Sequence, residues 1–427
     1  MVKLIILIVF YLTFPLAIIQ MCKKWSICKK IGCIVFAYGF GLLIGSVGIL
    51  PKGSEGYRNA LKGNATLPKS EIEMLISQDQ AEEGDYFTNQ VRSIQDNFRN
   101  LVGLAFPLML FSLNIKRWFR NASKGFISVI LALIAGPVMV TIGFLIFRNL
   151  IPEAWRLAGM FVGIYTGGTP NFVALSMALE VDANLFVLAI TYDTIVGAFL
   201  VLFFITIAPK IFRFILPPFK YKGNEKDTNH QVIEETEDLE DFSGMLQKNK
   251  IWPLLLALGI SLVICAISFG VSMLLQKPLP RLPQMAVIIL TITTLGILAS
   301  FIKRINKIEK TFQLGMYIIL IFSLAMASMA DLRTMLNIGM LNLVLFITWV
   351  YFGSLFLHLI LAKIFRIDSD NFLITATAYI FSPPFVPLVA KSLKNKDVII
   401  TGITGGLIGY VLGNYVGVAL AYFLKGL

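Results

Sequence analysis

The chain has 427 residues, of which 57% are hydrophobic and only 15% are charged, and its mean hydropathy is +0.78. Soluble domains have about 25% charged residues, so this composition excludes an ordinary soluble domain and predicts a polytopic membrane protein. The formal net charge of +12 does not indicate a nucleic-acid partner, because Lys and Arg in such a chain report how the loops are oriented across the bilayer.

Ten apolar segments of near-bilayer length recur along the chain and are predicted to be transmembrane helices. The first lies at the N-terminus, and no small-residue cleavage site follows it, so we expect a retained span rather than a signal peptide. In chain order the segments are 3–22, 31–50, 100–115, 126–147, 184–208, 251–275, 284–302, 311–330, 338–362 and 398–424.

Two polar segments lie between groups of these spans. Residues 51–99 are mixed in charge and are expected to form an external loop, with a helix from about Ser70. Residues 211–250 contain an acidic block between Glu234 and Asp241 and are predicted to be a solvated cytoplasmic linker.

Two further apolar segments, 156–180 and 370–391, are interrupted by nearly the same motif. The sequence TPNFVAL begins at Thr169, and SPPFVPL begins at Ser382, 213 residues later. Each motif starts with a residue type that caps helix N-termini, and Pro follows, which is favoured at the first helical position. We therefore predict that Thr169 and Ser382 are the N-caps of two restarting helices.

The basic loops indicate how these two segments meet the membrane. If segment 156–180 crosses the bilayer, the strongly basic stretch 210–226 faces outside, against the positive-inside rule. If the segment enters from outside and returns as a re-entrant hairpin, every basic loop is cytoplasmic. The same reasoning makes 370–391 a hairpin that enters from the cytoplasm. The alternative is that both segments lie on the membrane surface or cross it fully. The odd number of spans in each half inverts the second half relative to the first.

The predicted fold is therefore all-α, with two inverted repeats of five transmembrane helices plus one re-entrant hairpin each. The first repeat covers 1–210, the linker covers 211–250, and the second repeat covers 251–427. A weaker match of Asn114-Ile115-Lys116 to Asp331-Leu332-Arg333, at an offset of 217, supports the same frame. Doubled helix breaks of this kind indicate a transporter's binding site, with both hairpin tips converging near the midplane.

The hairpin tips carry the candidate substrate-binding residues. Gly167 and Gly168 let the backbone turn sharply, and the restarting helix presents free N–H groups at the positive end of its dipole, which favours an anion. The alternative is that these residues only shape kinked hairpins, since Gly and Pro also occur in ordinary membrane helices. The candidate residues are Thr166, Gly167, Gly168, Thr169, Pro170, Asn171, Phe381, Ser382, Pro383 and Pro384.

Asp193 is the clearest ionisable residue deep within an apolar segment. An acid at that depth is costly, so we predict that it binds a coupling cation or carries a proton; the alternative is a structural hydrogen bond to a neighbouring helix. Thr191, Thr404 and Asn414 complete the candidate ion-coupling set. No cofactor is expected, and a sodium ion at this set is the only metal expected.

The sequence contains no pattern that predicts an enzyme. An intramembrane aspartyl protease needs a second deep aspartate beside Asp193, and the sequence offers none. No P-loop occurs either, so the chain is not an ATP-driven pump by itself.

The stretches Tyr165–Ala174 and Gly406–Tyr415 resemble the DUF819 family of bacterial membrane proteins. That family is similar in plan to the sodium/glutamate, citrate and bile-acid symporters, which have inverted five-span repeats, Gly-rich re-entrant hairpins and an elevator-like movement. The resemblance implies that residues 166–171 and 382–384 hold the solute. The Ser-Pro-Pro at 382–384 departs from the Gly-rich pattern of the symporters, which leaves the solute and the coupling ion open.

The sequence thus predicts a secondary active transporter of a small anionic solute, such as a carboxylate, an amino acid or a short peptide, coupled to sodium or protons. The alternatives are an ion channel or cation/proton exchanger on the same scaffold, or a non-transporting membrane receptor or subunit. The expected partners are the lipid bilayer, the solute and a second copy in a homodimer. The expected location is the bacterial inner membrane, with both termini outside.

Overall fold

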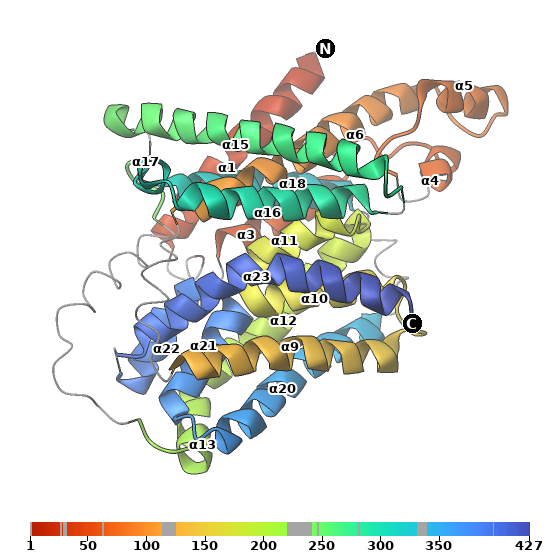
Figure 1. Ribbon diagram of the computed structural model, residues 1–427. Coiled ribbons are helices and arrows are strands. Elements are labelled where there is room, and N and C mark those ends of the chain that lie inside the picture. The colour runs from red at the N-terminus through yellow and green to blue at the C-terminus, as the bar shows by residue number, and fades with distance from the viewer. Residues whose placement is uncertain are drawn as a thin grey trace. The chain divides into compact units, whose positions relative to one another are not determined.

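The structure is a computed structural model that describes residues 2–25, 28, 32–61, 64–112, 125–219, 241–245, 247–280, 282–330, 340–395 and 397–427. In these ranges every regular element is a helix and no strand occurs (Figure 1). The predictions made for Asn114, Asp331 and the acidic block of the linker up to residue 240 lie outside the described residues.

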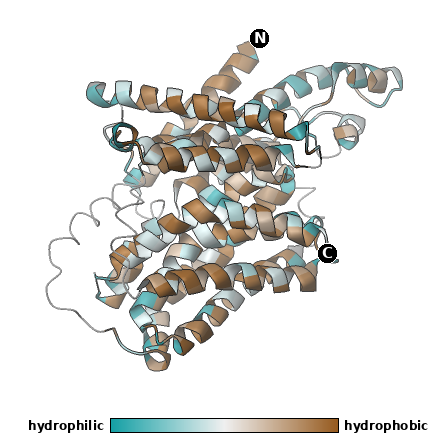
Figure 2. Ribbon diagram, viewed as in Figure 1, coloured by the Kyte–Doolittle hydropathy of each residue, from teal (hydrophilic) through white to brown (hydrophobic). Residues whose placement is uncertain are grey.

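Seven helices in the described part of the chain are long and apolar enough to cross a bilayer. They confirm the prediction of an all-α polytopic membrane protein. In Figure 2, α9 and α15 are examples of helices in which hydrophobic residues predominate. The seven are Val2–Lys24, Gly125–Phe147, Ala183–Thr206, Asn249–Gln276, Thr311–Met329, Leu341–Ile364 and Ile399–Lys425.

The described residues of the other three predicted spans form shorter helices. Segments 31–50 and 284–302 contain the apolar helices Cys33–Ser46 and Gln284–Ser300. Segment 100–115 is a short 3-10 turn, Leu101–Leu104, followed by a seven-residue helix, and its last residues lie outside the described ranges.

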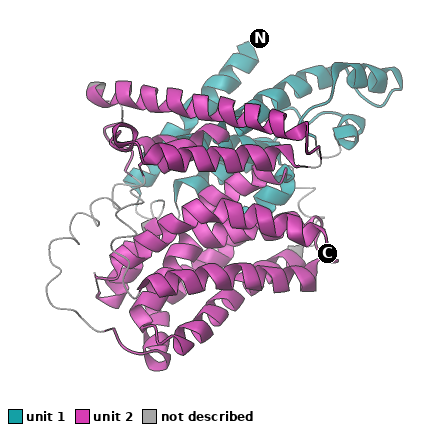
Figure 3. Cartoon of the chain, viewed as in Figure 1, with its two compact units in different colours: residues 1–102, 181–191, 316–338 teal, residues 103–180, 192–315, 339–427 magenta. Residues whose placement is uncertain are grey.

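The chain divides into two compact units (Figure 3). Unit 1 consists of residues 1–102, 181–191 and 316–338, and unit 2 consists of residues 103–180, 192–315 and 339–427. Each unit draws segments from both predicted repeats, so neither unit coincides with one repeat.

Unit 1 is held together by close packing and by a buried polar cluster. Gly45 lies so close to the eighth predicted span that a Cβ there would be 2.5 Å from the carbonyl oxygen of Ser328. The Ser328 hydroxyl lies 2.6 Å from that of Tyr11, and Gln95 donates to both oxygens. The helices of unit 1 are α1 (Val2–Lys24), α3 (Cys33–Ser46), α4 (Glu55–Leu61), α5 (Lys69–Ser77), α6 (Gly84–Asn100), the start of α12 (Ala183–Thr206) and most of α18 (Thr311–Met329).

The predicted external loop 51–99 is a small helical layer of unit 1 rather than an open loop. Its helices α4, α5 and α6 carry many of the hydrophilic residues visible in Figure 2. The Asp85 carboxylate accepts from the Ser54 hydroxyl at 2.6 Å and from the Glu82 N–H at 2.9 Å. The side chain of Tyr57 is fully buried beside it. The helix expected from about Ser70 is confirmed, since α5 begins at Lys69.

Unit 2 is built around two helices that lie side by side in Figure 1, α10 (Ala154–Gly167) and α23 (Ile399–Lys425). Most residues of α10 are buried on every side, so neighbouring helices shield it from lipid. The remaining elements are α7 (Ala105–Phe111), α9 (Gly125–Phe147), α11 (Thr169–Ala178), the rest of α12 from Tyr192, α13 (Ala208–Ile215), α15 (Lys248–Gln276), α16 (Gln284–Ser300), α17 (Lys303–Asn306), the start of α18, α20 (Met340–Ile364), α21 (Ser369–Phe381), η3 (Pro383–Phe385) and α22 (Val386–Leu393).

Candidate functional site

The first interrupted segment forms an antiparallel helical hairpin made of α10 and α11. The break falls at Gly168, whose backbone has φ +70° and ψ −160°. A Cβ at Gly159 would lie 2.7 Å from the Leu179 side chain, and the rings of Phe161 and Phe172 are 5.6 Å apart. These pairs converge toward the break, so the chain reverses direction there.

Arg156 closes the base of this first hairpin. Its guanidinium donates to the carbonyl of Glu180, just past the end of α11, at 2.9 Å. The same guanidinium pairs with the Glu153 carboxylate at 2.8 Å. The two arms are therefore tied at the end opposite the tip.

The second interrupted segment forms a similar hairpin from α21, η3 and α22. The break falls at Ser382, with φ +82° and ψ +161°. Its base is closed by Asp370, which accepts from Asn395 at 2.9 Å and faces Arg213 at 3.4 Å. Arg213 also donates to the carbonyl of Leu393 at 2.8 Å, so it ties both arms together.

The structure corrects the predicted cap of the first hairpin. Gly168, not Thr169, is the residue before α11, and Pro170 is the second helical residue rather than the first. A β-branched Thr does not adopt a positive φ readily, so the break moves to the neighbouring glycine. In the second hairpin the cap is Ser382 as predicted, but its side chain makes no capping hydrogen bond.

The two tips lie directly against each other within unit 2. A Cβ added to Gly168 would overlap the Ser382 hydroxyl. Helix α23 runs under both tips: a Cβ at Gly409 would overlap the carbonyl oxygen of Thr166, and one at Gly406 would lie 2.6 Å from Cγ of Pro383. The glycines of α23 therefore provide the surface on which both breaks rest.

The predicted substrate-binding residues are gathered at this contact. Asn171 is 3% exposed, and its amide nitrogen donates to the carbonyl of Gly409 at 2.8 Å. The Thr166 hydroxyl donates within its own helix, to the carbonyl of Val162 at 2.8 Å. The predicted residues that are buried are Thr166, Gly167, Gly168, Pro170, Asn171 and Pro383, and those that are half-buried are Thr169, Phe381 and Ser382. Pro384 belongs to η3 by its backbone.

A small cavity of about 20 Å³ lies beside the first tip. It is lined by residues of three helices of unit 2, and the described residues include two buried amides in its wall, Asn171 and Asn414. A volume of this size holds about one water molecule. The lining residues are Phe106, Met109, Leu110, Pro170, Asn171, Tyr410 and Asn414.

The four predicted ion-coupling residues make hydrogen bonds to different partners or lie on different helices, so the structure does not gather them in one site. Asp193 is 9% exposed on α12, and its carboxylate accepts a hydrogen bond from the hydroxyl of Tyr351 on α20. Asn414 donates instead to the Thr293 hydroxyl at 3.2 Å. Thr191 belongs to unit 1 and donates to the carbonyl of Val187 in its own helix. Thr404 is half-buried on α23.

Sequence reasoning missed the tyrosines around Asp193. The ring of Tyr165, on α10, lies 6.3 Å from the ring of Tyr351, so it connects the carboxylate to the first hairpin. Tyr165 and Tyr379 each precede a break by three residues, and the described residues offer the buried hydroxyl of Tyr379 no hydrogen-bond partner. The sequence contains this shared spacing, which could have pointed to the two tyrosines. It can be recognised only when Gly168 is aligned with Ser382.

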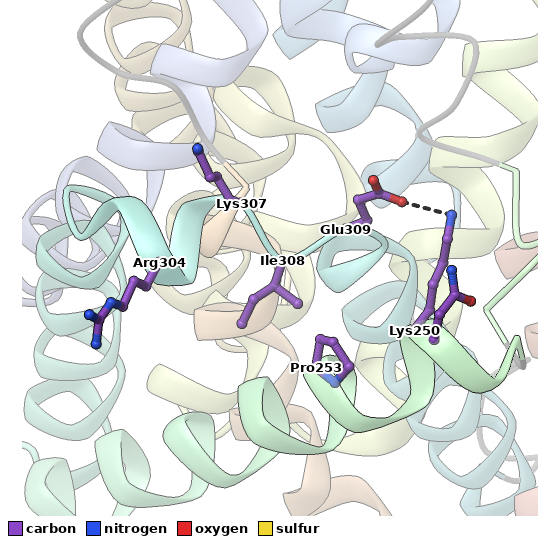
Figure 4. Close-up of a pocket in the computed structure, with 7 residues that line it drawn as sticks. Lys250, Pro253, Arg304, Lys307, Ile308 and Glu309 are labelled. Atoms are coloured by element: carbon purple, nitrogen blue, oxygen red, sulfur yellow. Dashed lines mark ion pairs between the residues drawn. The ribbon is translucent and has the colours of Figure 1, made fainter.

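A larger pocket, of about 380 Å³, lies in unit 2 beside the N-terminal end of α15 (Figure 4). Lys250 pairs there with Glu309 at 2.7 Å. Arg304 and Lys307 point away from each other in the figure, so they do not converge on one anion. The hairpin tips therefore remain the candidate site.

Comparison with known proteins places most of the chain in one family. Residues 87–427 match the family described as "Protein of unknown function (DUF819)". A relative in Bacillus subtilis (strain 168), the "Uncharacterized membrane protein YjcL", is 25% identical over 326 residues, which cover 74% of this chain and 80% of the relative.

Proposed function

The chain belongs to the DUF819 family of membrane proteins, and we propose that it is a secondary active transporter of a small anionic solute, coupled to sodium or protons. The observation that carries the proposal is the contact between the two helix breaks, at Gly168 and Ser382. Broken helices are tolerated at membrane depth where they are buried in protein or line a cavity, and in transporters such breaks form the binding site.

The first tip is the better anion site of the two. Helix α11 begins there, and its free N–H groups and helix dipole favour a negative charge. In the second tip Pro383 and Pro384 have no backbone N–H to offer. We assign the solute's acidic group to Thr169 and Asn171, with Ser382 closing over it.

Asp193 is the coupling residue of the proposed mechanism. A carboxylate buried in a membrane protein needs either a cation or a proton, and Tyr351 supplies a hydroxyl but no charge. Binding of the ion at Asp193 would act on the first hairpin through Tyr351 and Tyr165.

Movement of the hairpins is part of the proposal. The cavity beside the first tip has room for about one water, so the solute binds in a conformation in which the tips are further apart. Each hairpin would be re-entrant, with inverted repeats, an elevator-type shift and both termini outside the inner membrane. Labelling single cysteines introduced at residues 60 and 230 from the outside would test this orientation; labelling at residue 230 would contradict it.

Uptake by proteoliposomes tests the transport function. Purified protein is reconstituted, and uptake of carboxylates, amino acids and short peptides is measured with a sodium gradient, a proton gradient or neither. We expect uptake that depends on one gradient. Correctly folded protein that moves no solute under any gradient would contradict the proposal, and large single-channel currents would identify a channel instead.

Replacement of Asp193 tests the coupling role. Asp193→Asn should make uptake independent of the ion gradient while solute exchange continues. The matched control is Asp182→Asn, which removes a carboxylate that accepts from the Asn184 N–H at 2.8 Å at the start of the same helix. If both variants keep gradient-driven uptake, Asp193 is not the coupling residue.

A further inference from the structure

The orientation of the Asn414 side-chain amide is fixed by its neighbour. The hydroxyl of Thr293 donates its single proton to the carbonyl of Ile289 at 2.8 Å, so its oxygen is left to accept. The Asn414 amide nitrogen donates to that oxygen at 3.2 Å. The amide must therefore present its NH₂ group to α16 and its carbonyl oxygen elsewhere.

That carbonyl oxygen has no hydrogen-bond partner among the described residues, although Asn414 is only 3% exposed. A buried carbonyl without a donor is costly, so native proteins pair such groups with protein, water or a ligand. Asn414 also lines the cavity beside the first tip, whose walls are otherwise largely apolar. The cavity therefore suits a small group that donates a hydrogen bond.

The same cavity reaches the first turn of α11. Pro170 and Asn171 line it, and they are the second and third residues of this ten-residue helix. The first turn of the helix and Asn414, whose carbonyl oxygen is unpartnered, thus border one small space. The first attracts an acidic group, and the second accepts from a donor.

We propose that this cavity is the subsite for the donor group of the solute, an ammonium or a hydroxyl, held by the carbonyl of Asn414 while the first turn of α11 holds the acid. The inference rests on the proposed transport function and narrows its solute to an amino acid or hydroxy acid. It also moves Asn414 from the predicted ion-coupling set to the solute site.

Matched pairs of ligands test the subsite on purified full-length protein. Alanine and lactate are compared with propionate, and aspartate and malate are compared with succinate, by titration calorimetry and by ligand-induced thermal stabilisation. The member with the donor should bind at least about tenfold more tightly than the plain carboxylate. Equal binding within every pair, or no binding by any pair, would overturn the inference.

Two variants connect the preference to the cavity. Asn414→Leu should reduce binding of the donor-bearing ligand to the level of its plain partner and leave the plain carboxylate unchanged. Tyr415→Phe is the control, because it removes the hydrogen bond between Tyr415 and Thr294 (2.7 Å), which joins the same two helices outside the cavity. If Asn414→Leu does not fold, Leu110→Phe fills the cavity with the amide in place and should remove the same preference.

The remaining outcomes separate this inference from the proposed function. Stabilisation by sodium chloride alone that is lost in Asn414→Leu would assign the amide to a cation and overturn the solute subsite. Uptake of acids without any preference for the donor group would overturn the subsite and leave the transport function standing. Selective, Asn414-dependent binding without uptake would overturn transport and leave the subsite standing.

Discussion

The two hairpins reach the same backbone conformation at their tips with different residues. Gly168 has φ +70° and ψ −160°, and Ser382 has φ +82° and ψ +161°. This region of backbone space is open to glycine and costs other residues about 1–3 kcal/mol. The first hairpin therefore breaks without strain, whereas the second holds a strained serine against its partner.

Under the proposed transport function, this difference would give the two tips separate tasks. The first tip offers backbone N–H groups, a buried amide in Asn171 and a cavity beside it. The second tip has two prolines in place of N–H donors, and its base is closed by a buried carboxylate. We interpret the first hairpin as the one that recognises the solute and the second as a stiff cover.

The packing of α23 under the two tips gives the largest expected effect. Gly409→Ala places a methyl group on the backbone carbonyl of Thr166, which has little room to move, and should destabilise the protein by about 3 kcal/mol. Gly406→Ala meets the ring of Pro383 and should cost less. The apparent unfolding midpoint in detergent, followed by tryptophan fluorescence, measures both.

Gly270→Ala on α15 is the control for these two variants, because a Cβ built there has no atom of a neighbouring helix within 4 Å. It should leave the midpoint unchanged or raise it. If Gly270→Ala lowered the midpoint as much as Gly409→Ala, the close contact of Gly409 with Thr166 would not be the cause of the destabilisation.

Exchanging the break residues should move stability in opposite directions. Gly168→Ala introduces the positive-φ strain and should cost about 1–3 kcal/mol, whereas Ser382→Gly removes it and should stabilise by about 1 kcal/mol. The double variant shows how much of the first cost comes from contact with the Ser382 hydroxyl. Equal losses from both single changes would contradict the assignment of strain to the second tip.

Breaking the base of the second hairpin should lower stability more than breaking the base of the first. Arg213→Ala leaves the Asp370 carboxylate, which is nearly fully buried, without its cation and should cost about 1–3 kcal/mol. Arg156→Ala removes a hydrogen bond to the carbonyl of Glu180 and should cost about 1 kcal/mol. The apparent unfolding midpoint in detergent compares the two variants. A larger loss for Arg156→Ala than for Arg213→Ala would contradict the interpretation that the second hairpin is the stiffer one.

The Lys250–Glu309 pair, whose carboxylate is exposed, should have the smallest effect on stability. Lys250→Ala should cost less than about 1 kcal/mol, because water and salt screen the pair. The hydrogen bond and charge of Lys250 lower the pKa of Glu309 below its ordinary value of 4.5. The stabilisation that the ion pair gives is therefore fully present above the ordinary pKa and is lost as the pH falls through the lowered pKa. A scan of the midpoint against pH with and without Lys250 tests the sign.

Much of the fold could be read from local sequence, and some of the site could not. The apolar runs located the helices, because a run of near-bilayer length has few other stable structures. The repeated motif located both breaks to within one residue. It misplaced the first because Thr169-Pro170 matches Ser382-Pro383 in sequence, while the positive φ falls on the preceding Gly168.

The sequence alone determined that this is a helical membrane protein with two interrupted segments, because hydrophobic length, Gly and Pro act locally along the chain. Only the tertiary structure decided what meets at the breaks. Asp193 pairs with Tyr351, and Asn414 donates its NH₂ to Thr293 and lines the cavity beside the first tip. Those partners lie more than a hundred residues away in the chain, and helix packing, which no local pattern encodes, brings them together.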